Sequence, residues 1–432
     1  MSKIVSIKQV PYWWDTARLP RVERAKPLPQ AVDVAILGAG YTGLSAARTL
    51  ARQGAAVSIL EAESAGWGAS SRNGGMVLTG LKSDIALVIR KYGLNLAREL
   101  MAASLAAIDC VEEIIAEEGI ECDFLRCGHL LVASKPSHFQ GFSEQARLLR
   151  EQFGRSVQLV AKLDLSSEIG SERFHGGLVD PLSGGLNPAR YVAGLIEAAE
   201  RAGAQIHDHT RVERIERESR GFLVYTARGA LRARAVLVAT NGYTGPATPA
   251  LQRRIVPIGS YIIATEPLDP ELARQLSPPG RMIFDSRHYL HYFRLTPDRR
   301  LLFGGRAAFF PPTAATVLQS AAILRRNMLA IYPQLEDTKV EYAWGGNLGF
   351  AFDLLPHAGK LDGLHYALGY AGHGVALATY LGQIMGQTLA GQAVDNPFAK
   401  LRFLTAPFGL YRGRPWFLPL AGAWYKLLDW IQ

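Results

Sequence analysis

The sequence is poor in cysteine and contains no long apolar run. Only Cys110, Cys122 and Cys127 occur among its 432 residues, and a small, odd number of cysteines does not build a disulfide framework. No stretch of 18 or more uninterrupted apolar residues exists, which argues against a membrane-spanning helix. The start, Met1 to Ile4, lacks the apolar core of a signal peptide. A reducing, cytoplasmic location is therefore expected.

Blocks of charge are also missing. The chain has 47 Lys and Arg against 38 Asp and Glu, a net charge of +9, yet no block of five like charges occurs. No zinc-finger, ribonucleoprotein or homeodomain pattern is present, so nucleic acid is not an expected partner. No metal is expected, because Cys122, Cys127 and His129 lack a fourth ligand at zinc spacing.

Glycine, in contrast, is abundant. Its 43 residues are about 10% of the chain, against ~7% in average proteins. Extra glycine indicates backbone that turns with positive φ or approaches something closely. The chain is 48% apolar and longer than the ~250–300 residues at which a single core stops growing, so two lobes are expected.

The clearest motif is a glycine-rich turn between a strand and a helix. The apolar run Val32 to Leu37 predicts a buried strand, and helical spacing follows over Tyr41 to Gln53. A second strand, Ala56 to Leu60, ends in Glu61. This order is the dinucleotide-binding pattern: a strand, a G-x-G-x-x-G turn, a helix, a second strand and an acidic residue. In this pattern the helix N-terminus binds a pyrophosphate, and the carboxylate binds a ribose.

Two further small-residue segments distinguish FAD from NAD. The first, residues 66–75, follows Glu61 closely, and the second, residues 369–376, opens another helix. A larger cofactor with two ends needs more than one close backbone approach, so FAD is favoured. The second helix N-terminus suits the electron-rich N1–C2=O end of a reduced flavin. The predicted cofactor-binding residues in these three segments are Gly38, Gly40, Tyr41, Thr42, Gly43, Glu61, Ala62, Gly68, Ala69, Ser70, Arg72, Asn73, Gly74, Gly75, Gly372, His373, Gly374 and Val375.

These segments carry a family resemblance. The chain resembles the D-amino-acid oxidase/glycine oxidase superfamily of FAD amine oxidoreductases, and most of all γ-glutamylputrescine oxidoreductases and related amine dehydrogenases. The matching stretches include DVAILGAGYTGLSAA, EAESAGWGASSRNGG, GGLVDPLSGGLNPARYVAGLIEAAERAGA, VLVATNGYT, YFRLTPDRRLLFGGR, WGGNLGFAFDLLPHAG and GYAGHGVALATYLGQ, spread over residues 33–390. The resemblance implies further cofactor contacts through Val212, Thr240, Asn241, Gly242 and Gly346. It also implies non-covalent flavin, because residues 348–374 hold no cysteine.

The predicted fold class is α/β, with an α+β second domain. The resemblance implies a discontinuous Rossmann-type FAD-binding domain with an inserted antiparallel-sheet substrate domain. The expected boundaries are 1–85, 155–247 and 345–395 for the FAD-binding domain, 86–154 and 248–344 for the substrate-binding domain, and 396–432 for an aromatic, basic tail.

The inferred reaction moves a hydride from an amine-bearing carbon to flavin N5, so no acid–base triad is required. Predicted catalytic residues are Arg294, Tyr292, Trp344 and His373, and predicted substrate-binding residues are Tyr261, His288, Tyr292 and Arg294. Arg294 could clamp a substrate carboxylate or pair with Asp298 on the surface. Trp344 could contact the flavin or belong to the core. His373 could act at the flavin or cap a helix.

Several alternatives stay open. The substrate is a small-molecule amine such as γ-glutamylputrescine, or else a D-amino acid, glycine or sarcosine, and the chain could also be a flavin-binding subunit without turnover. The electron acceptor is oxygen or a quinone-type carrier. Residues 400–432 combine tryptophans with a local charge of +4 from five basic residues and Asp429, which suits a peripheral membrane contact or packing on the protein or a partner subunit.

Overall fold

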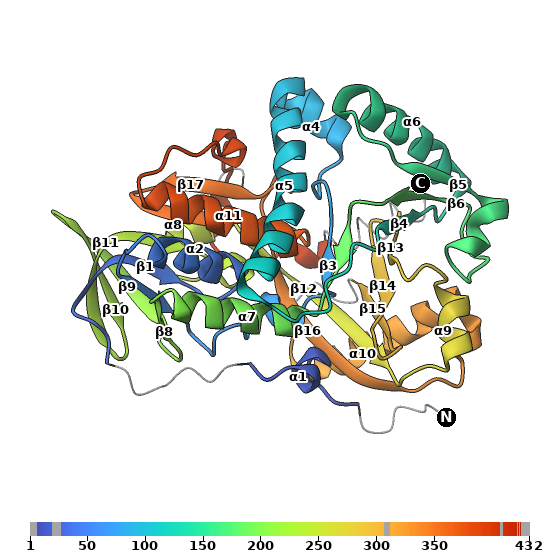
Figure 1. Ribbon diagram of the computed structural model, residues 1–432, viewed down its shortest axis with the longest axis horizontal. Coiled ribbons are helices and arrows are strands. Elements are labelled where there is room, and N and C mark those ends of the chain that lie inside the picture. Colours follow the sequence, from blue (N-terminus) through green and yellow to red (C-terminus); the bar gives the residue numbers. More distant parts are fainter. Residues whose placement is uncertain are drawn as a thin grey trace.

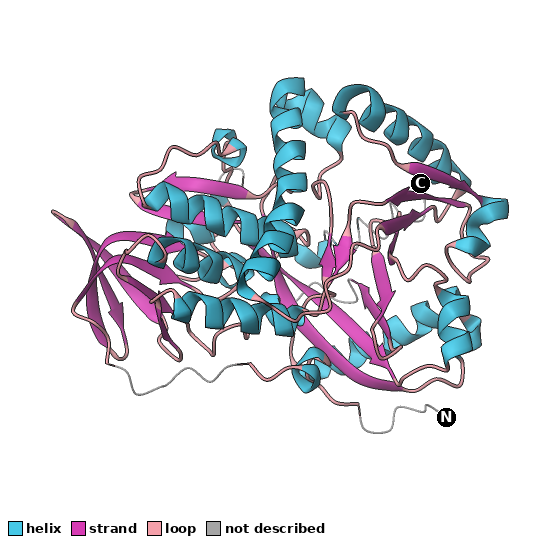
Figure 2. Cartoon of the chain, in the orientation of Figure 1, coloured by secondary structure: helices cyan, strands magenta, loops and turns pink. Residues whose placement is uncertain are grey.

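The computed structural model describes residues 7–19, 27–305, 312–406, 409–420, 422 and 424. Two eight-stranded sheets organise this part of the chain (Figure 1). In Figure 2 the helices gather around the two sheets rather than forming a domain of their own. The α/β class with a second sheet domain is therefore confirmed.

The first sheet has a parallel centre. Its order is β17 (His357–Leu361), β18 (Leu364–Leu368), β11 (Gly229–Val238), β1 (Ala31–Leu37), β2 (Val57–Leu60) and β8 (Gln205–His207), and the hairpin of β9 (Val212–Glu218) and β10 (Gly221–Thr226) joins β11. Strands β18, β11, β1, β2 and β8 run parallel. Side chains alternate across β1, so Val34 and Ile36 enter the helix-covered core, and Ala35 and Leu37 enter the core on the opposite face.

Four helices cover one face of this sheet. They are α2 (Tyr41–Ala51), α5 (Leu94–Glu118), α7 (Pro188–Arg201) and α11 (Gly374–Leu389), and they share one apolar core with β1 and β2. Helices α2 and α11 approach closely, because a Cβ on Gly382 would lie 2.4 Å from the Thr42 carbonyl oxygen. This contact holds the C-terminal part of the chain against the first glycine turn.

The second sheet is mostly antiparallel. Its order is β16 (Val340–Phe350), β12 (Val256–Thr265), β15 (Leu301–Gly305), β14 (His291–Leu295), β13 (Met282–Asp285), β4 (His129–Val132), β6 (Gly176–Asp180) and β5 (Gln158–Ala161). Helix α10 (Ala314–Ile331) packs on one face. Tyr12 and Trp13, at the start of the short α1 (Trp13–Thr16), pack on the other with Trp344.

Several shorter elements lie in the connections between the two sheets. They are α3 (Ala69–Arg72), α4 (Ile85–Tyr92), α8 (Pro249–Gln252) and the small pair β3 (Met76–Val77) and β7 (Gly184–Gly185). Helices α6 (Pro136–Phe153) and α9 (Pro270–Leu276) instead connect strands of the second sheet. In the described part of the chain, none of the helices has both the length and the apolar character needed to cross a bilayer.

Part of the predicted domain division is wrong. Residues 155–247 were expected with the first sheet, but β5 and β6 pair in the second. The expected boundary at 344/345 falls inside β16, a single strand of the second sheet. Helix α5, expected with the substrate domain, belongs to the core of the first sheet. These partners are far away in sequence, so local patterns do not reveal them.

Candidate cofactor and amine site

The β1–α2 turn leaves no room for side chains. Gly38 has φ +100°, and a Cβ on Gly43 would lie 2.0 Å from the Gly38 carbonyl oxygen. The N-cap residue of α2 is Gly40, which has no side chain to cap the helix. Its first amide, on Tyr41, donates to Ser70 Oγ at 3.0 Å. The open, positive end of α2 is therefore suited to an anion such as a pyrophosphate.

Glu61 lies directly after β2 and is tied to the same turn. Its carboxylate accepts hydrogen bonds from the backbone N–H of Ala39 at 2.8 Å and of Glu63 at 2.9 Å. Burial raises the pKa of this carboxyl. A carboxylate has about four acceptor positions, so acceptor capacity remains for a ribose diol. Ala62 follows it in the chain, and Val212 begins β9 close to Thr210, whose N–H donates to the Glu61 carbonyl at 2.6 Å.

The second small-residue segment is held by aromatic and amide groups. The Arg72 guanidinium lies 4.7 Å from the Trp14 ring centroid and 4.4 Å from that of Trp67. It donates to the Trp67 carbonyl at 2.8 Å. Asn73 donates to the carbonyls of Ala69 and Ser70, both at 3.0 Å. The backbone of α3 is therefore fixed beside the N-terminus of α2.

The third segment lies against the first. Thr42 Oγ1 lies 2.7 Å from Tyr370 Oη, which joins the start of α2 to the turn before α11. This turn contains Gly372 at φ +98°, and His373 is the N-cap residue of α11, with no side-chain hydrogen bond to the helix. Asn241 Oδ1 accepts the Gly369 N–H at 3.0 Å. A second helix N-terminus is therefore open beside the first.

The neighbouring segment 240–242 closes onto β16. A Cβ on Gly242 would lie 2.8 Å from the Asn347 carbonyl oxygen. Thr240 Oγ1 lies 2.8 Å from Thr244 Oγ1. The segment is thus packed so tightly against residues 347–349 that only glycine fits at position 242.

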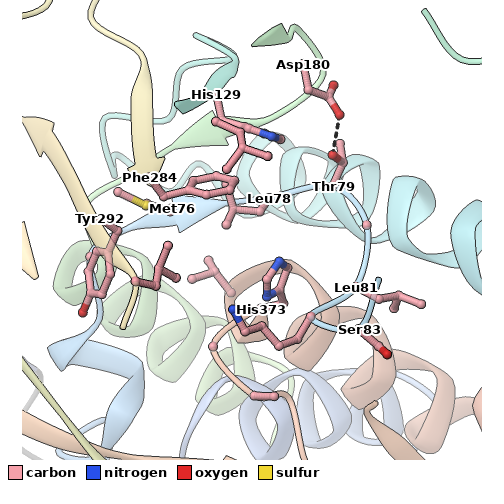
Figure 3. A pocket seen from close by; sticks show the side chains of 18 of the residues that line it. Met76, Leu78, Thr79, Leu81, Ser83, His129, Asp180, Phe284, Tyr292 and His373 are labelled. Atoms are coloured by element: carbon pink, nitrogen blue, oxygen red, sulfur yellow. Dashed lines mark hydrogen bonds between the residues drawn. The ribbon is translucent and has the colours of Figure 1, made fainter. Parts of the chain in front are cut away.

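A cavity of about 550 Å³ lies between the two sheets. The cofactor-side wall comes from Asn347 and from eight predicted residues: Ala69, Arg72, Asn73, Gly74, Gly346, Gly372, His373 and Val375. The opposite wall is largely apolar and comes from β3, the loop after it, strands of the second sheet and the residue before β14: Met76, Leu78, Leu131, Ile262, Phe284, Tyr292 and Leu290. Figure 3 shows His129 and Phe284 on one side of this cavity and His373 on the other.

Two imidazoles line the cavity in their neutral form. Burial lowers the pKa of His129 to about 4 and that of His373 to about 3. His129 Nδ1 lies 2.7 Å from Ser183 Oγ. Within the described residues, His373 Nδ1 is buried and has no hydrogen-bond partner. Neutral imidazole can accept a hydrogen bond from an amine, whereas imidazolium cannot.

A buried ion pair completes the wall near His129. Asp180 pairs with Arg155 and accepts a hydrogen bond from Thr79 Oγ1 at 2.6 Å. Both ionic side chains are 7% exposed. Because the carboxylate and the guanidinium neutralise each other, this part of the wall is polar without a net charge.

Two of the four predicted substrate-binding residues line the cavity. Tyr292 does so, and its hydroxyl lies 3.2 Å from Ser260 Oγ. His288 does so as well. Tyr261 does not, because side chains alternate along β12: Ser260 and Ile262 face the cavity, while Tyr261 packs in the α10-covered core.

Arg294 is not among the cavity-lining residues either. It shares a strand face with Tyr292, as predicted, but its Nη1 donates to the carbonyls of Gly75 at 2.9 Å and Leu186 at 3.0 Å. Burial lowers its pKa to about 10. Neither predicted alternative fits, since the guanidinium ties the loop before β3 to the second sheet instead of clamping a carboxylate or pairing with Asp298.

Trp344 also has a structural position. Its side chain is 1% exposed, packs with Trp13, and donates from Nε1 to the Arg72 carbonyl at 2.8 Å. The core alternative therefore describes it, and the flavin contact does not. Sequence reasoning missed Lys82, Arg155, Asp180, Ser260 and Asn347 as lining residues, because no local motif marks them.

The residues present fit FAD. Three glycine-rich segments lie near the N-termini of α2 and α11, as a cofactor with a pyrophosphate and a distant ring system requires. Asn347 Oδ1 and His373 Nδ1, both on cavity-lining residues, are buried without partners in the described part of the chain. Unpaired buried polar atoms are costly and suit a polar group supplied by a ligand.

Known proteins were compared with this chain. A family model described as FAD dependent oxidoreductase (DAO) matches residues 33–388. A probable oxidoreductase OrdL of Haemophilus influenzae is 34% identical over 396 residues, covering 90% of this chain and 89% of its own length. The γ-glutamylputrescine oxidoreductase of Escherichia coli is 33% identical over 400 residues, 92% of each chain.

A solved structure supports the fold. The crystal structure of glycine oxidase from Geobacillus kaustophilus has a TM-score of 0.72 at 22% identity, covering 87% of this chain and 100% of that one. The family model covers most of this chain, and two relatives exceed 30% identity over nine-tenths of it. The chain therefore belongs to the DAO family of FAD-dependent oxidoreductases.

Proposed function

We propose that the chain oxidises a C–N bond of a small-molecule amine in the cavity between the two sheets. In this proposal, the first sheet and helices α2 and α11 hold FAD without a covalent bond, and the second sheet supplies the amine site. The observation that carries the proposal is the single cavity with two kinds of wall. One wall is the glycine-rich cradle, and the other is an apolar surface with a few polar groups, as ligand sites commonly have.

The chain's residues orient the amine and keep it neutral. A neutral amine has the nitrogen lone pair that must form the C=N bond as the hydride leaves the adjacent carbon. Imidazoles that stay neutral can accept amine N–H groups, and Tyr292 and Ser260 place two hydroxyls nearby. The apolar wall limits water around the reacting C–H bond. FAD, when bound, supplies the hydride acceptor at N5, and water then hydrolyses the imine product.

An amine without a carboxylate beside the reacting carbon is favoured over an amino acid. The predicted carboxylate clamp, Arg294, donates to backbone carbonyls instead. The E. coli relative, a γ-glutamylputrescine oxidoreductase at 33% identity, suggests a γ-glutamylated or similar long amine. The electron acceptor in this proposal is oxygen or a quinone-type carrier.

Anaerobic flavin reduction tests this proposal. The purified holoenzyme is mixed without oxygen with γ-glutamylputrescine, simple monoamines, D-alanine, glycine and sarcosine, and the visible flavin absorbance is followed. We expect the long amine to bleach the flavin and the amino acids to react poorly. Admission of oxygen then separates an oxidase, which recovers its colour and forms peroxide, from a dehydrogenase. Flavin that no amine reduces would contradict the proposal and favour a non-catalytic subunit.

A matched pair of variants tests the amine site. Tyr292→Phe removes a hydroxyl from the cavity, whereas Tyr225→Phe removes one on the β9–β10 hairpin. We expect the first to slow flavin reduction by the amine and the second to leave it unchanged, with equal flavin content in both. Acid precipitation should release the flavin into the supernatant if no covalent bond holds it.

A further inference from the structure

The chain after α11 is fixed to the wall of the cavity. Tyr411 donates to the Ile255 carbonyl at 2.7 Å, and Leu418 is 2% exposed. These two side chains share an apolar cluster with Ala371, and Leu348 packs against the same cluster. Since Leu348 and Ala371 line the cavity, this segment covers the outside of the wall. It is therefore part of the folded protein.

The same segment turns large apolar side chains outward. Leu410, Trp416, Leu420 and Trp424 are 61%, 60%, 69% and 58% exposed. Residues 418–420, 422 and 424 are helical, and residues 416 and 417 form the turn that leads into them. Positions 416, 420 and 424 are spaced by four residues, and this spacing places side chains on one face of a helical segment. Leu418 and Gly422 are buried between them. Trp416, Leu420 and Trp424 thus form an exposed apolar stripe, which we call the tryptophan stripe.

Basic residues accompany this stripe. Arg402, Arg412 and Arg414 are exposed, and residues 396–424 contain no Asp or Glu. A surface that combines exposed tryptophan and leucine with unopposed positive charge suits the interface of an anionic bilayer. The rings enter the headgroup region there, and the guanidinium groups meet lipid phosphates. A protein partner would need its own acidic and apolar patch.

The tryptophan stripe also lies on the cavity side of the molecule. Tyr289 donates to the Gly422 carbonyl at 3.1 Å, and its neighbours His288 and Leu290 line the cavity. A surface that rests on a bilayer through the stripe would therefore hold the cavity wall near the lipid.

We propose that the tryptophan stripe, together with Arg402, Arg412 and Arg414, forms a peripheral docking surface for anionic lipid bilayers. The tryptophan stripe inserts at the headgroup level, and Arg402, Arg412 and Arg414 contact the lipid phosphates. This proposal concerns location and does not depend on which amine is oxidised.

Vesicle co-sedimentation tests it. The full-length holoenzyme is incubated with vesicles of phosphatidylcholine alone or with phosphatidylglycerol added. We expect binding to the anionic vesicles, weakened by added salt because exposed charges are screened. The triple variant Trp416→Ser/Leu420→Ser/Trp424→Ser should lose more than about tenfold in partitioning, which corresponds to ~1.4 kcal/mol. Arg412→Glu/Arg414→Glu should reduce binding to anionic vesicles only.

A control variant separates the stripe from general surface hydrophobicity. Leu125 and Leu163 are 65% and 94% exposed and lie outside the tail, so Leu125→Ser/Leu163→Ser should bind vesicles like the wild type. Flavin content and melting temperature confirm that each variant is folded. Absence of wild-type binding to anionic vesicles would overturn the proposal, as would equal binding of the triple variant. Loss of a dimer in the triple variant, without vesicle binding by the wild type, would assign the stripe to a second copy of the chain.

Discussion

At the scale of single residues, Gly43 sets the closest approach in the cofactor cradle. A Cβ there would lie 2.0 Å from the Gly38 carbonyl oxygen, a backbone atom that cannot rotate away. Substitution must therefore shift the start of α2 relative to β1, which changes the position of the open helix N-terminus.

We predict that Gly43→Ala strongly reduces the flavin-to-protein ratio and destabilises the fold by roughly 1–3 kcal/mol, as overpacking commonly does. The absorbance ratio of the purified protein and a urea titration measure the two effects. Gly245→Ala is the control, because the nearest atom to its Cβ would be 3.9 Å away. Full flavin content in Gly43→Ala would show that the turn tolerates a side chain.

The lowered pKa of His129 makes the free energy of unfolding depend on pH, and the direction of this dependence can be stated. Burial holds the pKa of His129 at about 4, below its ordinary value of 6.5. Between these two values the unfolded chain binds more protons than the folded one, so stability falls as the pH drops from 6.5 towards 4. Above pH 6.5 both states are neutral at this residue, and the dependence disappears.

His129→Asn should accordingly reduce the loss of stability between pH 7 and pH 5. Asparagine keeps a polar atom near the position of Nδ1 and cannot be protonated. Urea midpoints at the two pH values measure the change. His209→Asn, at an exposed position, should leave the difference between the two midpoints as it is in the wild type. An unchanged pH response in His129→Asn would contradict the assignment.

At the scale of elements, the pairing of α2 with α11 brings the first and third cofactor segments together. Gly382 and Gly386 lie four residues apart on α11, and both face α2. Their Cβ atoms would lie 2.4 Å from the Thr42 carbonyl oxygen and 2.9 Å from that of Ala46. Two helices approach this closely only where side chains are absent.

We expect Gly382→Ala to push the two helices apart and to lower both melting temperature and flavin content. Differential scanning fluorimetry and flavin absorbance report these effects. Gly141→Ala, within α6 and with no atom within 4 Å of its Cβ, should be neutral or slightly stabilising, since alanine favours helices. A melting temperature for Gly382→Ala equal to that of the control would refute close packing as the cause.

Local signals allowed the elements around the first glycine turn to be predicted closely. The strand expected at 32–37 is Ala31–Leu37, and the helix expected at 41–53 is Tyr41–Ala51. Apolar runs, glycine turns and helical spacing are properties of adjacent residues. In contrast, β5 and β6 join the second sheet through a partner, β4, that precedes them by more than twenty residues.

The same difference between local and long-range signals explains which residues of the site could be predicted. The glycine-rich segments are recognisable because their backbone geometry requires particular residues. The residues of the cavity wall are not recognisable in this way. Side chains alternate along a strand, so the sequence tells which residues share a face of β12 or β14 but not which face meets the cavity. Tyr261 was therefore assigned to the substrate, while Ser260 on the other face of β12 was missed. Arg294 does share a face with Tyr292, but its bonds to the distant Gly75 and Leu186 carbonyls leave no local signal.

At the scale of the whole molecule, FAD would contact three segments that are far apart in the sequence. Because a ligand that binds only the folded state stabilises it by mass action, FAD at a hundredfold excess over its Kd should add about 2.7 kcal/mol.

Removal of the flavin should therefore lower the melting temperature, and added FAD should restore it in a concentration-dependent way. Riboflavin, which lacks the pyrophosphate and adenine, should restore far less because it leaves the N-terminus of α2 without its anion. Thermal melts across a titration of each compound measure this. A melting temperature independent of FAD would be incompatible with the cradle described above.

The first sheet is assembled from residues 31–60, 205–238 and 357–368, and its last piece is followed by α11. During synthesis, the ribosome must deliver the residues up to Leu368 before β18 can pair with β11. The nascent amino-terminal lobe thus leaves the exit tunnel with an unfinished sheet edge, which is the kind of surface that chaperones protect. We therefore expect a chain truncated before α11 to bind no flavin, because it lacks both the end of the third cofactor segment and a helix of the first core.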